Sequence, residues 1–167
     1  MKITTVALLF VLLGGCAGWG HQSASPDWQT IDVNGLFTFR LPAVFVKRAS
    51  SSDQGERVEY AQGDTKVVAI WGHSESGAYD KRRQSWMNDY TESTTRIRGL
   101  RANIRTYSHT VNAKRTYRAE LNLGNWQNGE VQLYLRVEGT DPTTLDTARE
   151  IFKSVTLPIP PPERSPF

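Results

Sequence analysis

The sequence predicts an α+β fold, a mostly antiparallel sheet covered by helices, and two observations support this. Short runs of alternating apolar and polar residues, separated by turn residues, fill most of the chain, which is typical of antiparallel strands with one buried face. Helical periodicity occurs in only two places, at residues 79–92 and after Asp141. The 167 residues contain no internal repeat and have the length of one domain.

The first half of the chain predicts two hairpins. Residues 28–33 and 36–41 flank Asn34-Gly35, a dipeptide that favours the two-residue turn of a β-hairpin. Residues 57–61 and 66–71 flank Gly63-Asp64 in the same way, and residues 44–47 extend the edge. We therefore expect this half to form antiparallel sheet.

A change of period predicts a helix over residues 79–92. Tyr79, Trp86, Met87 and Tyr90 fall at i, i+7, i+8 and i+11, which is one face of a helix. A basic connection is expected to follow, up to residue 102.

Strands are predicted next at residues 103–110, 114–123 and 130–138, with a turn at 124–129. Because side chains alternate across a sheet, one face of the last hairpin must be core. Leu121 and Leu133 are expected to be buried there, and their neighbours Asn122 and Gln132 to be exposed.

The last predicted element is a helix that begins at Asp141-Pro142, a capping residue followed by a proline at the first helical position. Residues 158–167 are expected to be a proline-rich extended tail. The apolar stripe of the helix consists of Leu145, Ala148, Ile151 and Phe152.

Two short motifs resemble a known family. Phe37-x-Phe39-x-x-Pro42-x-x-Phe45 resembles the opening of PsbP-like proteins and their DcrB-like bacterial relatives, and residues 148–155 resemble their closing helix. The resemblance extends over residues 27–157. It implies a PsbP-like α/β/α sandwich, frequent lipoprotein forms, and accessory or binding roles without shared catalytic residues.

The N-terminus predicts export and lipidation. Lys2, an apolar run over residues 3–13 and Gly14-Gly15 precede Cys16, the single cysteine. This run falls short of the ~20 apolar residues of a membrane-spanning helix and is typical of a signal peptide. The segment also resembles the lipobox of bacterial lipoproteins, which implies that residues 1–15 are removed, that Cys16 carries the lipid, and that residues 16–26 form a tether. By the same resemblance, Ala17 after the cysteine points to the outer membrane, with the domain facing the periplasm.

Positive charge is concentrated in one segment. Residues 81–118 hold ten Lys or Arg and two acidic residues, Asp89 and Glu92, a local net charge of +8, although the whole chain has a net charge of only +3. Such a segment is either a solvated face mixed with acidic neighbours or a patch for an anionic partner. The candidate binding residues are Arg82, Arg83, Arg96, Arg98, Arg101 and Arg105, together with Trp126 in the turn of the last hairpin.

Catalytic signals are weak. Residues 72–77 approach the G-x-S-x-G elbow of serine hydrolases around His73 and Ser74, but the second glycine comes one position late. His73, Glu75 and His109 could in principle form a metal site, although their spacing does not require one. We expect no enzyme, metal or cofactor, and no nucleic-acid partner for an exported protein.

The sequence thus favours a lipid-anchored, non-enzymatic binding, accessory or immunity factor for an envelope protein. An alternative is that a basic face binds an anionic envelope component such as phospholipid, lipopolysaccharide or peptidoglycan. A small hydrolase is the third hypothesis.

Overall fold

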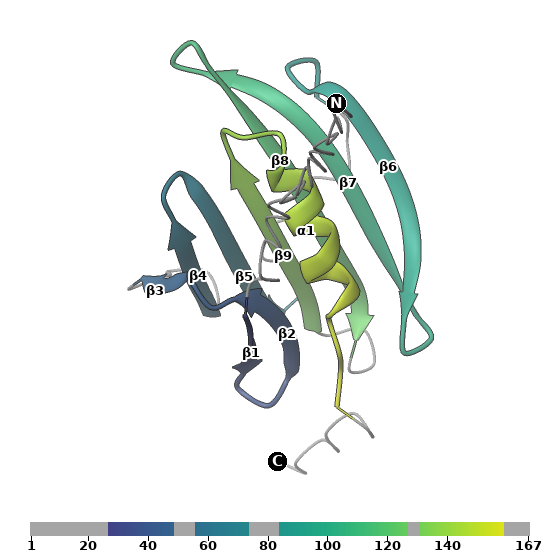
Figure 1. Ribbon diagram of the computed structural model, residues 1–167. Coiled ribbons are helices and arrows are strands. Elements are labelled where there is room, and N and C mark those ends of the chain that lie inside the picture. Colours follow the sequence, from purple (N-terminus) through teal and green to yellow (C-terminus); the bar gives the residue numbers. More distant parts are fainter. Residues whose placement is uncertain (1–26, 49–55, 74–83, 127–130, 159–167) are drawn as a thin grey trace, which may run out of the picture.

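The computed structural model describes residues 27–48, 56–73, 84–126 and 131–158. The predicted signal peptide, the tether and nearly all of the predicted tail lie outside these residues. Figure 1 shows the chain order of the elements. They are β1 (Trp28–Val33), β2 (Phe37–Pro42), β3 (Val46–Arg48), β4 (Glu56–Gln62), β5 (Thr65–His73), β6 (Asn88–Ile97), β7 (Leu100–Val111), β8 (Lys114–Trp126), β9 (Val131–Gly139) and α1 (Thr144–Lys153).

The strands form two antiparallel sheets. The larger sheet has seven strands in the order β3-β4-β5-β9-β8-β7-β6, and β1 pairs only with β2. The predicted hairpins at residues 28–41, 57–71 and 114–138 are confirmed, with Leu121 paired with Leu135 and Leu123 with Leu133. Because β9 inserts between β5 and β8, β6 becomes the far edge of the sheet.

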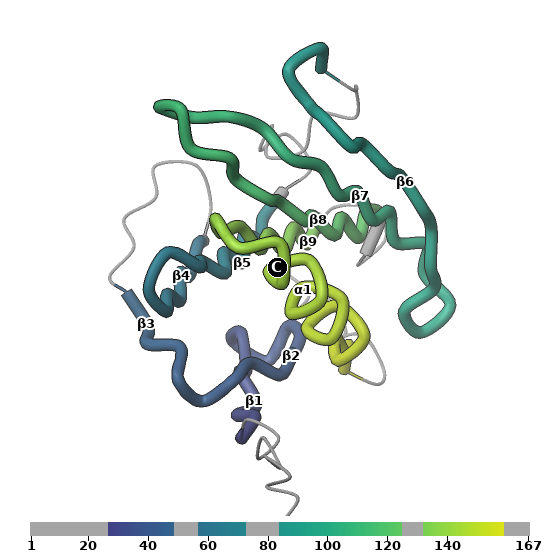
Figure 2. Tube along the Cα trace, turned by 45° about the horizontal axis from the view of Figure 1, so that its top comes forward, coloured from purple at the N-terminus to yellow at the C-terminus, as the bar shows by residue number. Residues whose placement is uncertain are grey.

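One face of the large sheet carries the core. Helix α1 and the β1–β2 hairpin lie on the same side of the curved sheet (Figure 2). Leu121 and Leu133 are fully buried there, as predicted. The core residues of this face include Phe37, Phe39, Leu41, Val67, Ala69, Leu123, Leu135, Val137, Ala148 and Ile151.

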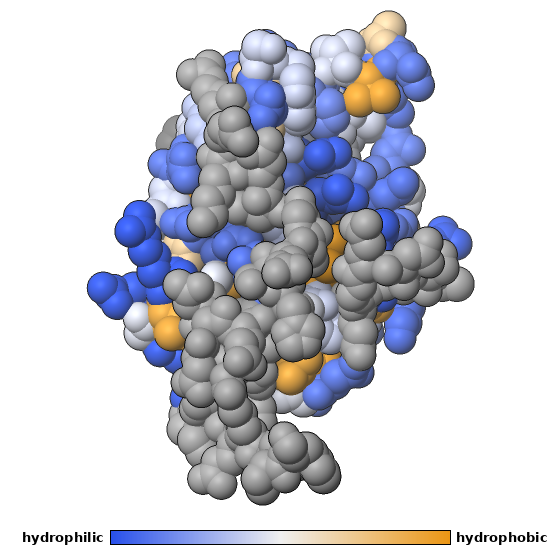
Figure 3. Space-filling view, turned by 180° about the vertical axis from the view of Figure 1, so that it is seen from behind, coloured by the Kyte–Doolittle hydropathy of each residue, from blue (hydrophilic) through white to orange (hydrophobic). Residues whose placement is uncertain are grey.

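The predicted α/β/α sandwich is wrong. Among the described residues α1 is the single helix, and it covers part of one face. The opposite face is mostly hydrophilic where described residues are visible (Figure 3). No helix of the described part has the length and hydropathy needed to span a bilayer. The fold is therefore a β-rich antiparallel sheet with one short helix.

The predicted helix over residues 79–92 is also wrong where the structure describes it. Residues 88–97 form β6, and the run Thr91 to Thr95 is rich in β-branched residues, which fit strands better than helices. Of the residues that suggested a helix, Met87 is buried but lies in a turn at 84–87, Tyr90 belongs to β6, and Tyr79 lies outside the described residues. The expected basic connection is the β6–β7 hairpin.

The helix begins later than predicted. Asp141 accepts hydrogen bonds from the backbone N–H of Thr143 (2.8 Å) and from its hydroxyl (2.7 Å), and the first helical residue is Thr144. Strand β9 passes close beneath this start, because a Cβ at Gly139 would lie 2.5 Å from the Thr144 hydroxyl. A larger residue at position 139 would therefore require this hydroxyl, and that of Thr65 at 2.8 Å, to move.

Candidate ligand-binding groove between α1 and β6

The groove exists because one short helix cannot cover a wide sheet. Seven strands about 4.8 Å apart span roughly 29 Å, whereas a helix with its side chains is about 10 Å wide. Helix α1 packs on β8, β9 and β2, and β7 and β6 extend beyond it (Figure 2). A cavity of about 640 Å³ remains between α1 and β6, within the size range of small-molecule sites.

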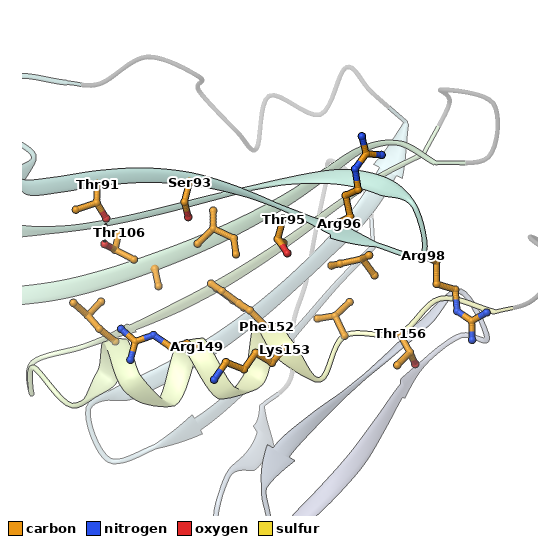
Figure 4. A pocket seen from close by; sticks show the side chains of 15 residues that line it. Thr91, Ser93, Thr95, Arg96, Arg98, Thr106, Arg149, Phe152, Lys153 and Thr156 are labelled. Carbon is orange, nitrogen blue, oxygen red and sulfur yellow. Dashed lines mark hydrogen bonds between the residues drawn. The ribbon is translucent and has the colours of Figure 1, made fainter.

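The floor of the groove is apolar and its wall is hydroxylated. Thr91, Ser93 and Thr95 point from β6 toward α1 (Figure 4). The hydroxyls of Thr91 and Thr106 share a hydrogen bond of 2.6 Å. Such a surface offers an apolar chain a place to bind, with hydroxyl groups beside it. The apolar lining residues are Ile97, Ile104, Ala119, Leu145, Phe152 and Val155.

The charged side chains that line the groove are all cationic. Arg96 and Arg98 come from β6 and the turn after it, and Arg149 and Lys153 come from α1. Within the described residues, no carboxylate belongs to the lining. Asp146 bonds Arg149 at 2.7 Å and Glu150 bonds Lys153 at 2.8 Å, and both acids belong to α1 without lining the groove. The potential in the groove is therefore positive.

The predicted basic residues do not share one face. Arg96, Arg98 and Arg101 gather at the β6–β7 turn and are exposed. Arg105 is 4% exposed and forms an ion pair with Glu120, which removes it from any binding patch. Arg82 and Arg83 lie outside the described residues.

Arg105 belongs to a buried polar network on the face opposite to α1. The carboxylate of Glu120 accepts hydrogen bonds from Arg105, from the hydroxyl of Tyr107 (3.0 Å) and from Tyr134. Beside it, Arg118 bonds Glu138 at 2.7 Å. Burial and the charge of Glu120 raise the pKa of Tyr107 to about 12, and the same causes raise the pKa of Tyr134. Both phenols therefore stay protonated and donate to Glu120.

His109 lies at the margin of this network. Its ring packs against Trp86, with centroids 5.5 Å apart, and against Tyr107. Its Nδ1 is buried without a hydrogen-bond partner among the described residues. Burial is the main cause that lowers the pKa of His109 below its ordinary value, and the charge of Arg118 lowers it further.

The fold separates the residues of the weak catalytic motif. His73 ends β5 where β8 reaches Trp126, whereas His109 pairs with Thr116, ten residues earlier on β8. Ten strand residues span about 33 Å, so these two histidines cannot share a metal or a substrate. Residues 74–77 lie outside the described part, and no cluster of metal-ligating side chains occurs in the rest.

Two further predicted sites are not tested. Trp126 is the last residue of β8 rather than part of the loop, and its backbone pairs with Val131 beyond a bulge. Cys16 lies outside the described residues.

Sequence reasoning missed the groove because its lining comes from distant segments. Thr91 was assigned to a predicted helix, and Arg149 and Lys153 were not among the candidate residues. The available signal was the alternation of hydroxyl residues from Thr91 to Thr95, since equivalent positions on a strand share one face.

Comparisons with known proteins identify the fold. The sequence matches no protein-family model and no curated protein. The structure is similar to that of the Ran-binding protein Mog1p of Saccharomyces cerevisiae, with 8% identity, a TM-score of 0.52, and coverage of 80% of this chain and 96% of that one. It also resembles LpqN, described as involved in cell envelope biogenesis of Mycobacterium tuberculosis, with 18% identity, a TM-score of 0.49, and coverage of 79% and 91%.

At these identities the likeness concerns architecture alone. The predicted PsbP-like resemblance is thus supported as far as a β-rich Mog1/PsbP-like fold, while a DcrB-like domain and lipidation stay predictions.

Proposed function

We propose that the protein is a lipid-anchored, non-enzymatic envelope protein that holds the apolar chain of an amphiphile in the groove between α1 and β6. The anchor is proposed from the N-terminal pattern that ends at Cys16. The binding role rests on one observation, the cavity of about 640 Å³ with an apolar floor and a polar wall. Assistance or inhibition of an envelope protein stays a prediction, with no surface assigned to it.

Several features support binding of an apolar chain. Ile97, Phe152 and Val155 are at least nine-tenths buried, yet they still line the groove. The gain comes from the ligand, because each CH₂ of an acyl chain that leaves water for this apolar floor contributes about 0.8 kcal/mol. The hydroxyl residues along β6 tolerate water when the groove is empty. No described side chain provides a nucleophile–histidine pair in this groove.

Filling the groove tests the proposal. The sample is the predicted mature chain, residues 16–167, with Cys16→Ala so that no acyl group of its own competes. The probe is a monoacylglycerol with a fluorescent acyl chain, titrated below its critical micelle concentration. Thr95→Trp should weaken binding at least tenfold, because an indole that displaces two CH₂ groups removes about 1.6 kcal/mol.

Thr94→Trp is the matched control. Thr94 is exposed on the same strand but pairs with Asn103 and lines no part of the groove, so this variant should bind like wild type. Thermal melts verify that both variants are folded. Absence of saturable binding by wild type, or equal binding by the two tryptophan variants, would contradict a chain-binding groove.

A further inference from the structure

We infer that the amphiphile carries an anionic headgroup, which lies at the end of the groove marked by Arg98 and Thr156. This inference rests on the proposed function, since it names the class of ligand for the same groove. The occupant is an acyl lipid with a headgroup of phosphate type, as distinct from a free anion or a neutral lipid.

Charge complementarity is the first argument. Arg98, Arg149 and Lys153 line the groove as cations, and within the described residues no carboxylate belongs to the lining; Arg96 is also a lining residue, but its guanidinium points away from α1 (Figure 4). A neutral headgroup could accept hydrogen bonds from these cations, whereas an anion would also gain electrostatic attraction from each cation that it approaches. The apolar floor therefore fits the acyl chain of the ligand, and the cations fit its anionic headgroup.

The ion pairs of the cations indicate which end of the groove would bind the headgroup. Arg149 and Lys153 each have a carboxylate one helical turn earlier, at 2.7 and 2.8 Å. Arg98 has no such acid within the described residues, and Arg96 bonds the carbonyl of Gly99 at 2.8 Å. Arg98 lies at the β6–β7 turn end of the groove, and Thr156 lies at that same end (Figure 4). An anion is therefore drawn to Arg98 rather than to the paired helix cations.

The local backbone does not favour an arginine at position 98. Arg98 occupies the left-handed region at φ 48° in a two-residue turn, a position that suits Asn or Gly better than Arg. Arg96 lies directly opposite Arg101 across β6 and β7, and like charges in that relation repel. Both features cost the turn stability, and the hydrogen bond from Arg96 to the Gly99 carbonyl acts in the opposite direction.

The test compares lipids that have the same acyl chain but different headgroups. Lysophosphatidic acid, lysophosphatidylcholine and monoacylglycerol of equal chain length displace the fluorescent probe from the same protein, and glycerol 3-phosphate serves as the anion without a chain. Lysophosphatidic acid should displace the probe at a concentration about fivefold or more below the other two lipids. Arg98→Asn should remove about fivefold of its affinity and leave that of monoacylglycerol unchanged.

Both variants should keep the fold, so a change in lipid affinity reports on binding. Arg98→Asn fits the turn at least as well as arginine. Arg101→Gln removes the same unit of charge from the same turn, but Arg101 does not line the groove, so this control should bind like wild type.

Equal displacement by all three lipids, or equal loss of affinity in the two variants, would overturn the anionic headgroup but not the chain-binding groove. Displacement by glycerol 3-phosphate alone would overturn the lipid as the source of the anion. No displacement by any lipid would contradict the proposed function itself.

Discussion

Two arginines of the basic segment show how the residue opposite a charged side chain determines its environment. Arg98 and Arg105 both belong to the basic segment in the sequence, yet Arg98 is exposed on a turn and Arg105 is 4% exposed against Glu120. The difference follows from register: Arg105 lies opposite Glu120 across β7 and β8. Removal of one member of such a pair leaves the other charge buried without compensation, which is strongly destabilising.

At the same scale, His109 predicts a pH dependence of stability. Its pKa is lowered in the folded protein by burial and by Arg118, whereas Glu138 and Glu120 act in the opposite direction. Below the ordinary value of about 6.5, the unfolded chain therefore binds a proton that the folded chain resists, so this group makes the fold less stable as the pH falls.

The substitution His109→Phe keeps an aromatic ring against Trp86 and Tyr107 but cannot take up a proton. Relative to wild type, the variant should become more stable as the pH falls from 7.5 to 5.0, as measured by the free energy of unfolding in urea. His21→Asn, in the predicted tether, is the control and should follow wild type. A constant difference between His109→Phe and wild type over this range would refute the assignment.

Among the elements, the β8–β9 hairpin carries the core. Leu121 is fully buried beneath α1, so Leu121→Ala should lower the free energy of unfolding by about 2 to 5 kcal/mol. Gln132→Ala, on the opposite face of the same hairpin, should change it by about 0.5 kcal/mol or less. Chemical denaturation of both variants measures this, and a costlier change at Gln132 would contradict the observed register.

Asn122 was expected to be exposed and is 5% exposed. It lies on the face opposite to α1, across from Tyr134, where the polar network is packed. The alternation of apolar and polar residues placed Asn122 correctly on the face opposite to the core. Whether a residue on that face is exposed depends on its neighbours in the fold, and the sequence of a single strand does not specify them.

Strand β6 shows why periodicity misleads. Trp86 and Met87 matched a helical spacing, although Trp86 packs on Tyr107 at a centroid distance of 5.7 Å from a turn rather than from a helix. The β-branched residues from Thr91 onward and the Arg98-Gly99 turn were local evidence for a hairpin. Two apolar side chains that are adjacent in sequence can contact the sheet from a turn as well as from a helix, so their spacing does not specify the backbone conformation.

For the whole molecule, the proposed anchor makes a prediction at Cys16. Cys16→Ala should abolish lipidation and leave an unprocessed precursor, because the sequence contains no second cysteine to accept the lipid. Metabolic labelling with a palmitate analogue measures this, with the wild-type chain as the labelled control. Label on the variant at the wild-type level would contradict the lipoprotein proposal.

The sequence by itself determined the hairpins at residues 28–41, 57–71 and 114–138, the buried face of β8 and β9 and the apolar stripe of α1, because these depend on alternation and turn residues within short segments. Tertiary structure alone decided the rest. The position of β6 at the far edge, the uncovered strip beside α1, and the placement of Arg98 in the groove but Arg105 in the network all depend on strand order. Strand order joins residues far apart in the chain, and no local pattern records which distant strand becomes a neighbour.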